Sequence, residues 1–211
     1  MARKPPPSSA STAPPWNPRY HQVTRLFHGC LRHHATKMMP PVGRVSHTAG
    51  QPDTDFGRGF YTTTLRRQAE DWAYLMHKRE PSMNRGLLDF QPVVVWFDVQ
   101  RDRLARLETL AFVRGDFNAT EYWSFVQHCR SSVRATKRAP AVVRHHERDS
   151  SGTPTWYDMV SGPVAAFWQQ RSAMLEADQY SFHTQHGVDV LNDLVVAGSR
   201  GVEYDVEQVI V

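Results

Sequence analysis

The sequence predicts an α+β domain built on a mostly antiparallel, split β-sheet with flanking helices. Short runs rich in β-branched and aromatic residues recur along the chain, and helical patterns interleave with them irregularly instead of in a repeating βαβ series. The chain has 211 residues, of which 40% are hydrophobic, which suffices for one sizeable core. We therefore expect one domain over residues 21–211, preceded by a flexible Pro/Ser-rich tail over residues 1–20.

The first half of the chain contains two predicted strands and a helix. Residues 22–30, "QVTRLFHGC", favour a first strand that Gly29 closes. In "DFGRGFYTTT", residues 55–64, two glycines permit a tight turn before a β-favouring run, and Thr64 is expected to cap the helix that follows. Apolar residues at helical spacing predict the core-facing stripe of that helix: Leu65, Ala69, Trp72, Ala73 and Met76.

The second half continues the same mixture of strands and helices. Strands are expected over residues 92–99, 155–165, 178–184 and 202–211, and helical segments over 120–130 and 185–194. The strand at 155–165 should end at the Gly162-Pro163 pair, where a turn is favoured. Between them, a segment near 130–154 is rich in Lys and Arg with little periodicity, which predicts a basic insertion loop.

Charge and motif content exclude several classes of function. The net charge of +4 is compatible with a phosphate-bearing ligand or a nucleic acid but diagnostic of neither. The sequence lacks GxxxxGK[ST], HExxH and GxSxG, and "GRGFYT" lacks the third glycine of a dinucleotide-binding fold. We expect no metal site, no contact with a membrane, and two ordinary thiols, Cys30 and Cys129, which fit a cytoplasmic protein.

Three blocks spread along the chain carry a resemblance to a known superfamily. The blocks "LFHG" (26–29), "DFGRGFYTTT" (55–64) and "DQYSFHT" (178–184) resemble, in order and spacing, the three catalytic motifs of the ADP-ribosyltransferases. Together with "YDMVSGPVA" (157–165), they most resemble a bacterial branch, the domain family of unknown function numbered 3990. The resemblance implies the fold of that superfamily and NAD as the substrate.

The resemblance also implies roles for individual residues. His28, Tyr61 and Gln179 would be catalytic. His28 would offer a ring nitrogen to a ribose hydroxyl, and the backbone of Gly29 would hydrogen-bond the nicotinamide amide, because no Cβ intervenes. Tyr61 would stack on nicotinamide and keep its hydroxyl free, while Phe60 would point into the core.

The implied NAD-binding residues extend beyond the catalytic set. Gly57 and Gly59 would let the chain turn tightly beside the ligand, and Thr62 or Thr63 would bond ribose or phosphate. The complete set of expected binding residues is His28, Gly29, Gly59, Tyr61, Thr62 and Thr63.

Gln179 stands where members of the superfamily commonly place a glutamate. A neutral amide can hold the ribose 2′-hydroxyl, but it stabilises a positively charged sugar less than a carboxylate does. Asp178 should face away from it, because side chains alternate along a strand. Glu203 is an alternative carboxylate and His183 an alternative base, although a structural role is the simpler interpretation of both.

The expected activity is NAD-dependent mono-ADP-ribosylation of a macromolecule, as a bacterial toxin, effector or defence component. The acceptor would be a protein or a nucleic acid, and an antitoxin or immunity protein is a candidate partner. If the tail is an export signal, the site of action is the cytoplasm of a host or target cell. Two alternatives remain open: an NAD glycohydrolase, and a degenerate domain that binds NAD, ADP-ribose or a partner without turnover.

Overall fold

The structure, a computed structural model, describes residues 22–41, 43–113, 120–131, 156–174, 176–193 and 200–204. It confirms the predicted α+β class, with mostly antiparallel sheets and several helices. The expected tail at 1–20 and nearly all of the basic loop near 130–154 lie outside the described residues.

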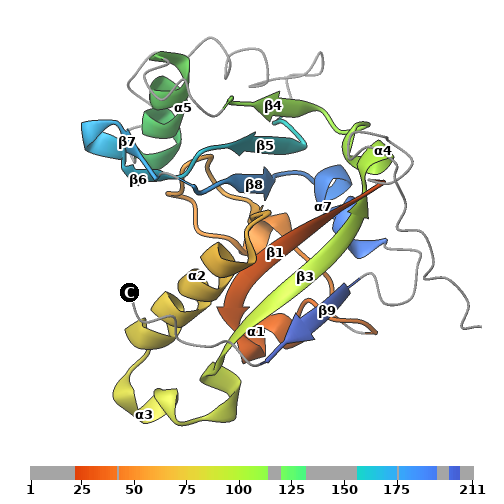
Figure 1. Cartoon of the computed structure of the whole chain (residues 1–211), viewed down its shortest axis with the longest axis vertical. Coiled ribbons are helices and arrows are strands. Elements are labelled where there is room, and N and C mark those ends of the chain that lie inside the picture. Colours follow the sequence, from red (N-terminus) through yellow and green to blue (C-terminus); the bar gives the residue numbers. More distant parts are fainter. Residues whose placement is uncertain are drawn as a thin grey trace, which may run out of the picture.

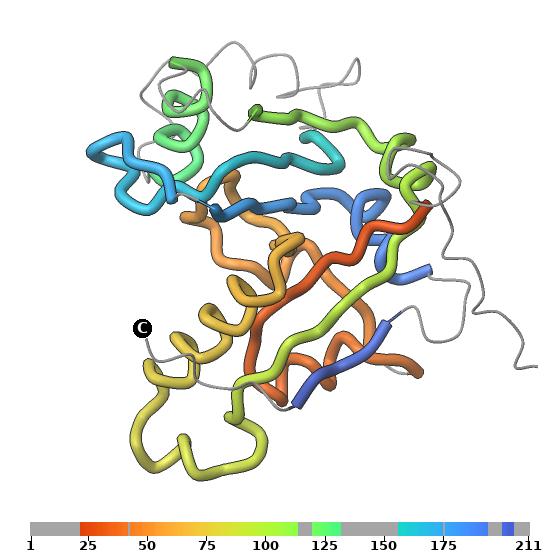
Figure 2. The backbone as a smooth tube through the Cα atoms, in the orientation of Figure 1, coloured from red at the N-terminus to blue at the C-terminus, as the bar shows by residue number. Residues whose placement is uncertain are grey.

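The first sheet has three antiparallel strands in the order β1-β3-β9. β1 (Val23–Leu31) and β3 (Pro92–Gln100) run side by side as a long pair (Figure 2), and β9 (Arg200–Glu203) lies on the far side of β3. β3 is expected to be buried because its sequence, "PVVVWFDVQ", is almost continuously apolar. The predicted bounds of β1 (22–30) and β3 (92–99) therefore hold to within one residue.

The second sheet has four strands in the order β2-β8-β5-β4. β2 (Phe60–Thr62), β8 (Gln179–Phe182) and β5 (Met159–Gly162) pair antiparallel, and β4 (Thr109–Ala111) pairs parallel with β5. β5 ends at Gly162 as predicted, but it begins at Met159, later than the expected residue 155. A separate two-stranded ribbon contains β6 (Ala165–Phe167) and β7 (Ser172–Ala173).

Two helices, α2 (Arg66–Arg79) and α5 (Thr120–Arg130), lie on the outer sides of the two sheets (Figure 1), whereas α1 (Arg32–Thr36) and α7 (Gln185–Asn192) contribute residues to the core between the sheets. α2 packs on β1 and β3, and α5 lies on the side of the four-stranded sheet. α7 follows β8, with Thr184 accepting a hydrogen bond from the backbone N–H of Gly187 as its N-cap. The remaining short elements are η1 (His47–Ala49), α3 (Ser82–Arg85), η2 (Leu88–Phe90), α4 (Arg101–Leu104) and η3 (Trp168–Gln170).

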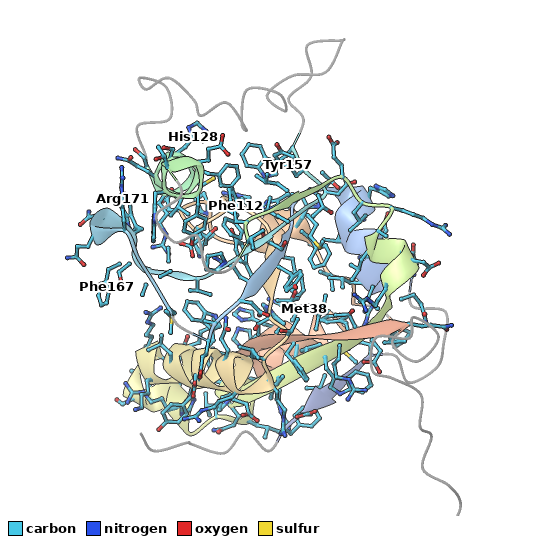
Figure 3. The ribbon with its side chains drawn as sticks, turned by 45° about the horizontal axis from the view of Figure 1, so that its top comes forward. Met38, Phe112, His128, Tyr157, Phe167 and Arg171 are labelled. Atoms are coloured by element: carbon cyan, nitrogen blue, oxygen red, sulfur yellow. The ribbon has the colours of Figure 1, made fainter. Side chains whose placement is uncertain are left out.

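Side-chain alternation divides the interior into layers. Even-numbered residues of β1 and odd-numbered residues of β3 face a core shared with the second sheet, whereas Phe27 and Val94 face α2. A second aromatic core lies between the four-stranded sheet and α5. Figure 3 labels Met38 from the first core and Phe112 and Tyr157 from the second.

The start and the exposed face of α2 differ from the prediction. Leu65 is the N-cap and makes no side-chain cap, while the Thr64 hydroxyl donates to Asp178 instead. Of the expected stripe only Ala69 and Ala73 are buried, and Trp72 is 50% exposed. The small residues face β1 because the helix lies so close to the strand that a larger side chain has no room there.

The last predicted strand begins two residues earlier than expected, and most of its predicted range is not described. It was expected over residues 202–211, but β9 occupies Arg200–Glu203, and residues 205–211 lie outside the described residues. Cys30 and Cys129 are both buried and are not joined in a disulfide, as predicted. Within the part of the chain that the structure describes, no helix is both long and apolar enough to span a bilayer.

Candidate functional site

The two sheets meet at one point and then separate. Phe27 of β1 and Thr63, just after β2, exchange two backbone hydrogen bonds of 2.8 and 2.9 Å. If the antiparallel ladder continued, the next such pair would join Gly29 and Tyr61. No backbone hydrogen bond joins them among the described residues. The strands therefore diverge after the bridge, and we call the unpaired stretch between Gly29 and Tyr61 the strand split.

His28 fills one side of the strand split. Its Nδ1 lies 2.7 Å from the carbonyl oxygen of Tyr61, and its ring lies 4.4 Å from the ring of Phe60. A carbonyl only accepts, so Nδ1 carries the proton and Nε2 is left as an acceptor. Burial lowers the pKa of His28 to about 4, so the imidazole is neutral at physiological pH. Among the described residues Nε2 has no hydrogen-bond partner.

Gly29 has backbone groups that face the strand split. In β1, Phe27 directs its N–H and C=O toward Thr63, and Gly29 lies two residues further along the same edge. Its N–H and C=O therefore point away from β3 and have no strand partner among the described residues. Glycine at position 29 also lets α2 pack closely against β1. A Cβ at this position would lie 1.9 Å from the carbonyl oxygen of Ala69 in α2. Close helix packing, and not ligand approach, requires glycine here.

The hydroxyl of Tyr61 is not free, contrary to the prediction. It donates to the carbonyl oxygen of Gly57 at 2.7 Å and accepts from the N–H of Phe56 at 3.0 Å. The hydroxyl of Thr54 lies 2.7 Å away. Gly57 has a φ of +82°, which glycine adopts without strain. Tyr61 thus holds the loop at residues 54–57 in place, and burial raises its pKa.

The other predicted binding residues also make internal contacts. A Cβ at Gly59 would lie 2.8 Å from Nδ1 of His183, so this glycine allows the two segments to approach closely. The buried hydroxyl of Thr62 donates to the carbonyl oxygen of Tyr180 at 3.1 Å. The hydroxyl of Thr63 lies 2.5 Å from Oδ1 of Asp178. Phe60 points into the core, as predicted.

Asp178 and Gln179 point to different partners, as strand alternation predicts. Asp178 accepts hydrogen bonds from the backbone N–H of Thr64 and from the hydroxyls of Thr63 and Thr64, which ties the start of β8 to the start of α2. Gln179 instead faces the aromatic core beneath α5, where it is 7% exposed. Its Nε2 donates to Oδ2 of Asp55 at 2.7 Å and to the carbonyl oxygen of Pro163 at 2.8 Å.

Asp55 is the residue that the sequence interpretation missed. The carboxylate is 3% exposed, and it accepts from Nε of Arg130 at 2.6 Å and from the N–H of Ala165 at 2.8 Å, in addition to Gln179. Asp55 opens the "DFG" block, so its position was visible. Nothing in the sequence indicated that the loop turns its carboxylate inward to meet a strand more than 100 residues away.

The two alternative catalytic residues are held elsewhere. Glu203 lies on β9, and its carboxylate forms an ion pair with Nε of Arg66 at 2.8 Å. His183 is buried, with Nδ1 2.8 Å from the carbonyl oxygen of Arg58 and Nε2 2.7 Å from the hydroxyl of Ser181. Burial lowers the pKa of His183 to about 4. Both ring nitrogens of His183 are thus engaged, which fits the structural role that the sequence favoured.

The structure therefore brings the three motif blocks together as neighbouring strands. β1 meets the end of β2 through the Phe27–Thr63 bridge, and β2 pairs with β8, which begins at Gln179. The side chains do not share one face. His28 lies on the side of the core between the sheets, whereas Tyr61 and Gln179 turn toward Asp55 and the aromatic core.

A comparison with protein-family models matches residues 27–192 to a family described as a protein of unknown function, DUF3990. The chain belongs to the DUF3990 family. The matched region runs from β1 to the end of α7, so it contains the strand split, Asp55 and Gln179. No curated protein and no solved structure matches this DUF3990 chain.

Proposed function

We propose that this DUF3990 protein binds NAD at the strand split and transfers its ADP-ribose to a macromolecule. The observation that carries the proposal is the pair of unpartnered backbone groups of Gly29, which lie beside the neutral imidazole of His28. The resemblance of the three motif blocks to ADP-ribosyltransferases agrees with it, because these blocks form the neighbouring strands at the split.

A carboxamide has the donor and acceptor that the edge of Gly29 requires. The carboxamide of nicotinamide would accept from the Gly29 N–H through its oxygen and donate to the Gly29 C=O through its nitrogen. Nε2 of His28 would accept a hydrogen bond from a ribose hydroxyl, which a protonated imidazole could not do. The low pKa of His28 keeps this acceptor available at neutral pH.

The reaction breaks the bond between the ribose C1′ and the nicotinamide nitrogen. Nicotinamide leaves with the bonding electrons, and the sugar passes through a cation-like transition state that negative charge stabilises. An acceptor oxygen or nitrogen then forms the new bond to C1′ and loses its proton to solvent. Gln179, at the start of β8 and backed by the Asp55 carboxylate, is the group that would contact the nicotinamide ribose.

The fate of labelled NAD tests the proposal. Purified protein is incubated with NAD labelled in the adenylate, alone and with cell lysate, and free nicotinamide is measured in parallel. We expect nicotinamide release and label on protein or nucleic acid in the lysate. Free ADP-ribose without any labelled macromolecule would show that the protein is a glycohydrolase, in which water is the acceptor, and not a transferase. Intact NAD in both reactions would contradict the proposed activity.

A further inference from the structure

The direction of the Gln179 amide is fixed by its neighbours. Oδ2 of Asp55, at 2.7 Å, and the carbonyl oxygen of Pro163, at 2.8 Å, can only accept hydrogen bonds. The end of the amide that faces them must therefore be the NH₂ group. Its carbonyl oxygen, Oε1, points the other way and has no partner in the described part of the chain.

The Asp55 carboxylate is itself held rigidly. Arg130 at the end of α5 and the backbone of Ala165 at the start of β6 both donate to it, so two separate elements fix its position. An amide that donates to a carboxylate carries more negative charge on its own carbonyl oxygen, because hydrogen bonds in a chain polarise one another. Asp55 therefore both aims Oε1 and strengthens it as an acceptor.

We propose that Asp55 is a positioning residue that directs Oε1 of Gln179 to a ribose hydroxyl of NAD. Through the amide it supplies negative charge that a glutamate on β8 would supply directly. This inference rests on the proposed NAD chemistry, but its first consequence concerns the protein alone. A carboxylate at position 179 puts a third acceptor oxygen beside Oδ2 of Asp55 and the carbonyl oxygen of Pro163, where a donor is required.

Among the described residues, the charged or titratable groups that face this contact come from α5, β2 and the loop before β2. Arg130 and Tyr122 face it from α5, Tyr61 from β2, and Asp55 from its loop. Burial raises the pKa values of both tyrosines, so they stay neutral. In a Gln179→Glu variant the introduced carboxyl adds a group beside Asp55 whose ionisation is expected between about pH 4 and pH 8.

The Gln179→Glu variant should lose stability as the pH rises. When the introduced carboxyl is protonated, its O–H replaces the amide N–H as donor to Asp55; when it ionises, two anions face each other. Its folded-state pKa is therefore raised above its unfolded value, so stability is retained at low pH and lost as the pH passes the folded pKa. Melting temperatures are measured from about pH 5 to pH 8 for wild type, Gln179→Glu and, as a matched control, Gln127→Glu on the exposed face of α5.

The rate of nicotinamide release by Gln179→Glu should depend on pH in the same direction as its stability. At about pH 5, Gln179→Glu should approach the wild-type rate, because Oε1 keeps its direction, and near pH 8 it should fall by about 10²-fold, as when one preorganised partner is lost. Gln127→Glu should follow wild type throughout. If Gln179→Glu matches wild type in melting temperature and turnover at every pH, the positioning role of Asp55 is wrong. If wild type releases no nicotinamide, the proposed activity is wrong. The melting temperatures then decide alone whether Asp55 fixes the orientation of the side chain at position 179.

Asp55→Asn provides a second test if Gln179→Glu does not fold. An asparagine amide that faced Gln179 would turn the Gln179 amide round and withdraw Oε1. We expect a fall in kcat of about 10-fold or more with a smaller change in KM, which a general loss of stability would not produce. An unchanged kcat in folded Asp55→Asn would overturn the inference.

Discussion

Replacing Gly29 by alanine will lower the melting temperature by about 6–12 °C, which corresponds to a loss of about 3 kcal/mol in the free energy of unfolding. The added Cβ would lie 1.9 Å from the carbonyl oxygen of Ala69 and 2.9 Å from the backbone nitrogen of Ala73. Both atoms belong to the backbone of α2, so no side-chain rotation relieves the clash, and the helix must move away from β1. Thermal unfolding followed by circular dichroism measures the change.

Gly86→Ala is the matched control for this substitution. A Cβ at Gly86 meets no atom within 4 Å, and its φ of −78° suits alanine. The control should melt within about 2 °C of wild type. Equal melting temperatures for Gly29→Ala and Gly86→Ala would show that α2 does not pack on β1 as closely as described.

Replacing Asp55 by alanine will cost about 3–5 kcal/mol in the free energy of unfolding, because it removes a buried carboxylate that pairs with the partly buried Arg130 guanidinium and accepts two further hydrogen bonds. Arg130, the N–H of Ala165 and Nε2 of Gln179 all lose an acceptor in a region where water does not readily replace it. Chemical denaturation of wild type and variant measures the difference, and a change in the midpoint without a change in slope identifies a loss of stability.

The exposed pair of Asp102 and Arg106 gives the comparison. Its charged atoms lie 3.6 Å apart, and both side chains are more than 60% exposed. Asp102→Ala should therefore change the free energy of unfolding by no more than about 0.5 kcal/mol. A similarly small effect for Asp55→Ala would mean that the Asp55 network does not hold the loop before β2.

Local sequence patterns predicted the strands better than they predicted how the elements contact one another. β1, β3 and β8 were found because each contains β-branched or aromatic residues, which form an almost continuous run in β3. The exposure of Trp72 could not be predicted, because helical spacing shows which residues share a face but not how large a residue that face admits. The close approach of α2 to β1 selects alanine, and the indole is left in solvent.

The candidate site shows the same limit of sequence reasoning. The sequence interpretation placed His28, Tyr61 and Gln179 on strands, and the structure shows that these strands are neighbours. The tyrosine hydroxyl was expected to be free, yet it closes the loop that carries Asp55. Likewise, the acid beside Gln179 was sought at Glu203, whereas the structure places Asp55 there. Long-range hydrogen bonds decide both cases, and they leave no periodic signal in the sequence.

Nicotinamide release by wild type, Gln179→Ala and the surface control Gln127→Ala tests most directly whether this site cleaves NAD. Wild type and Gln127→Ala should release nicotinamide at the same rate. Gln179→Ala should release it about 10²-fold more slowly, with a smaller change in NAD affinity by calorimetry, because it removes a group that acts mainly on the transition state. Equal rates for all three proteins, or no release by wild type, would contradict the assignment of NAD cleavage to this site.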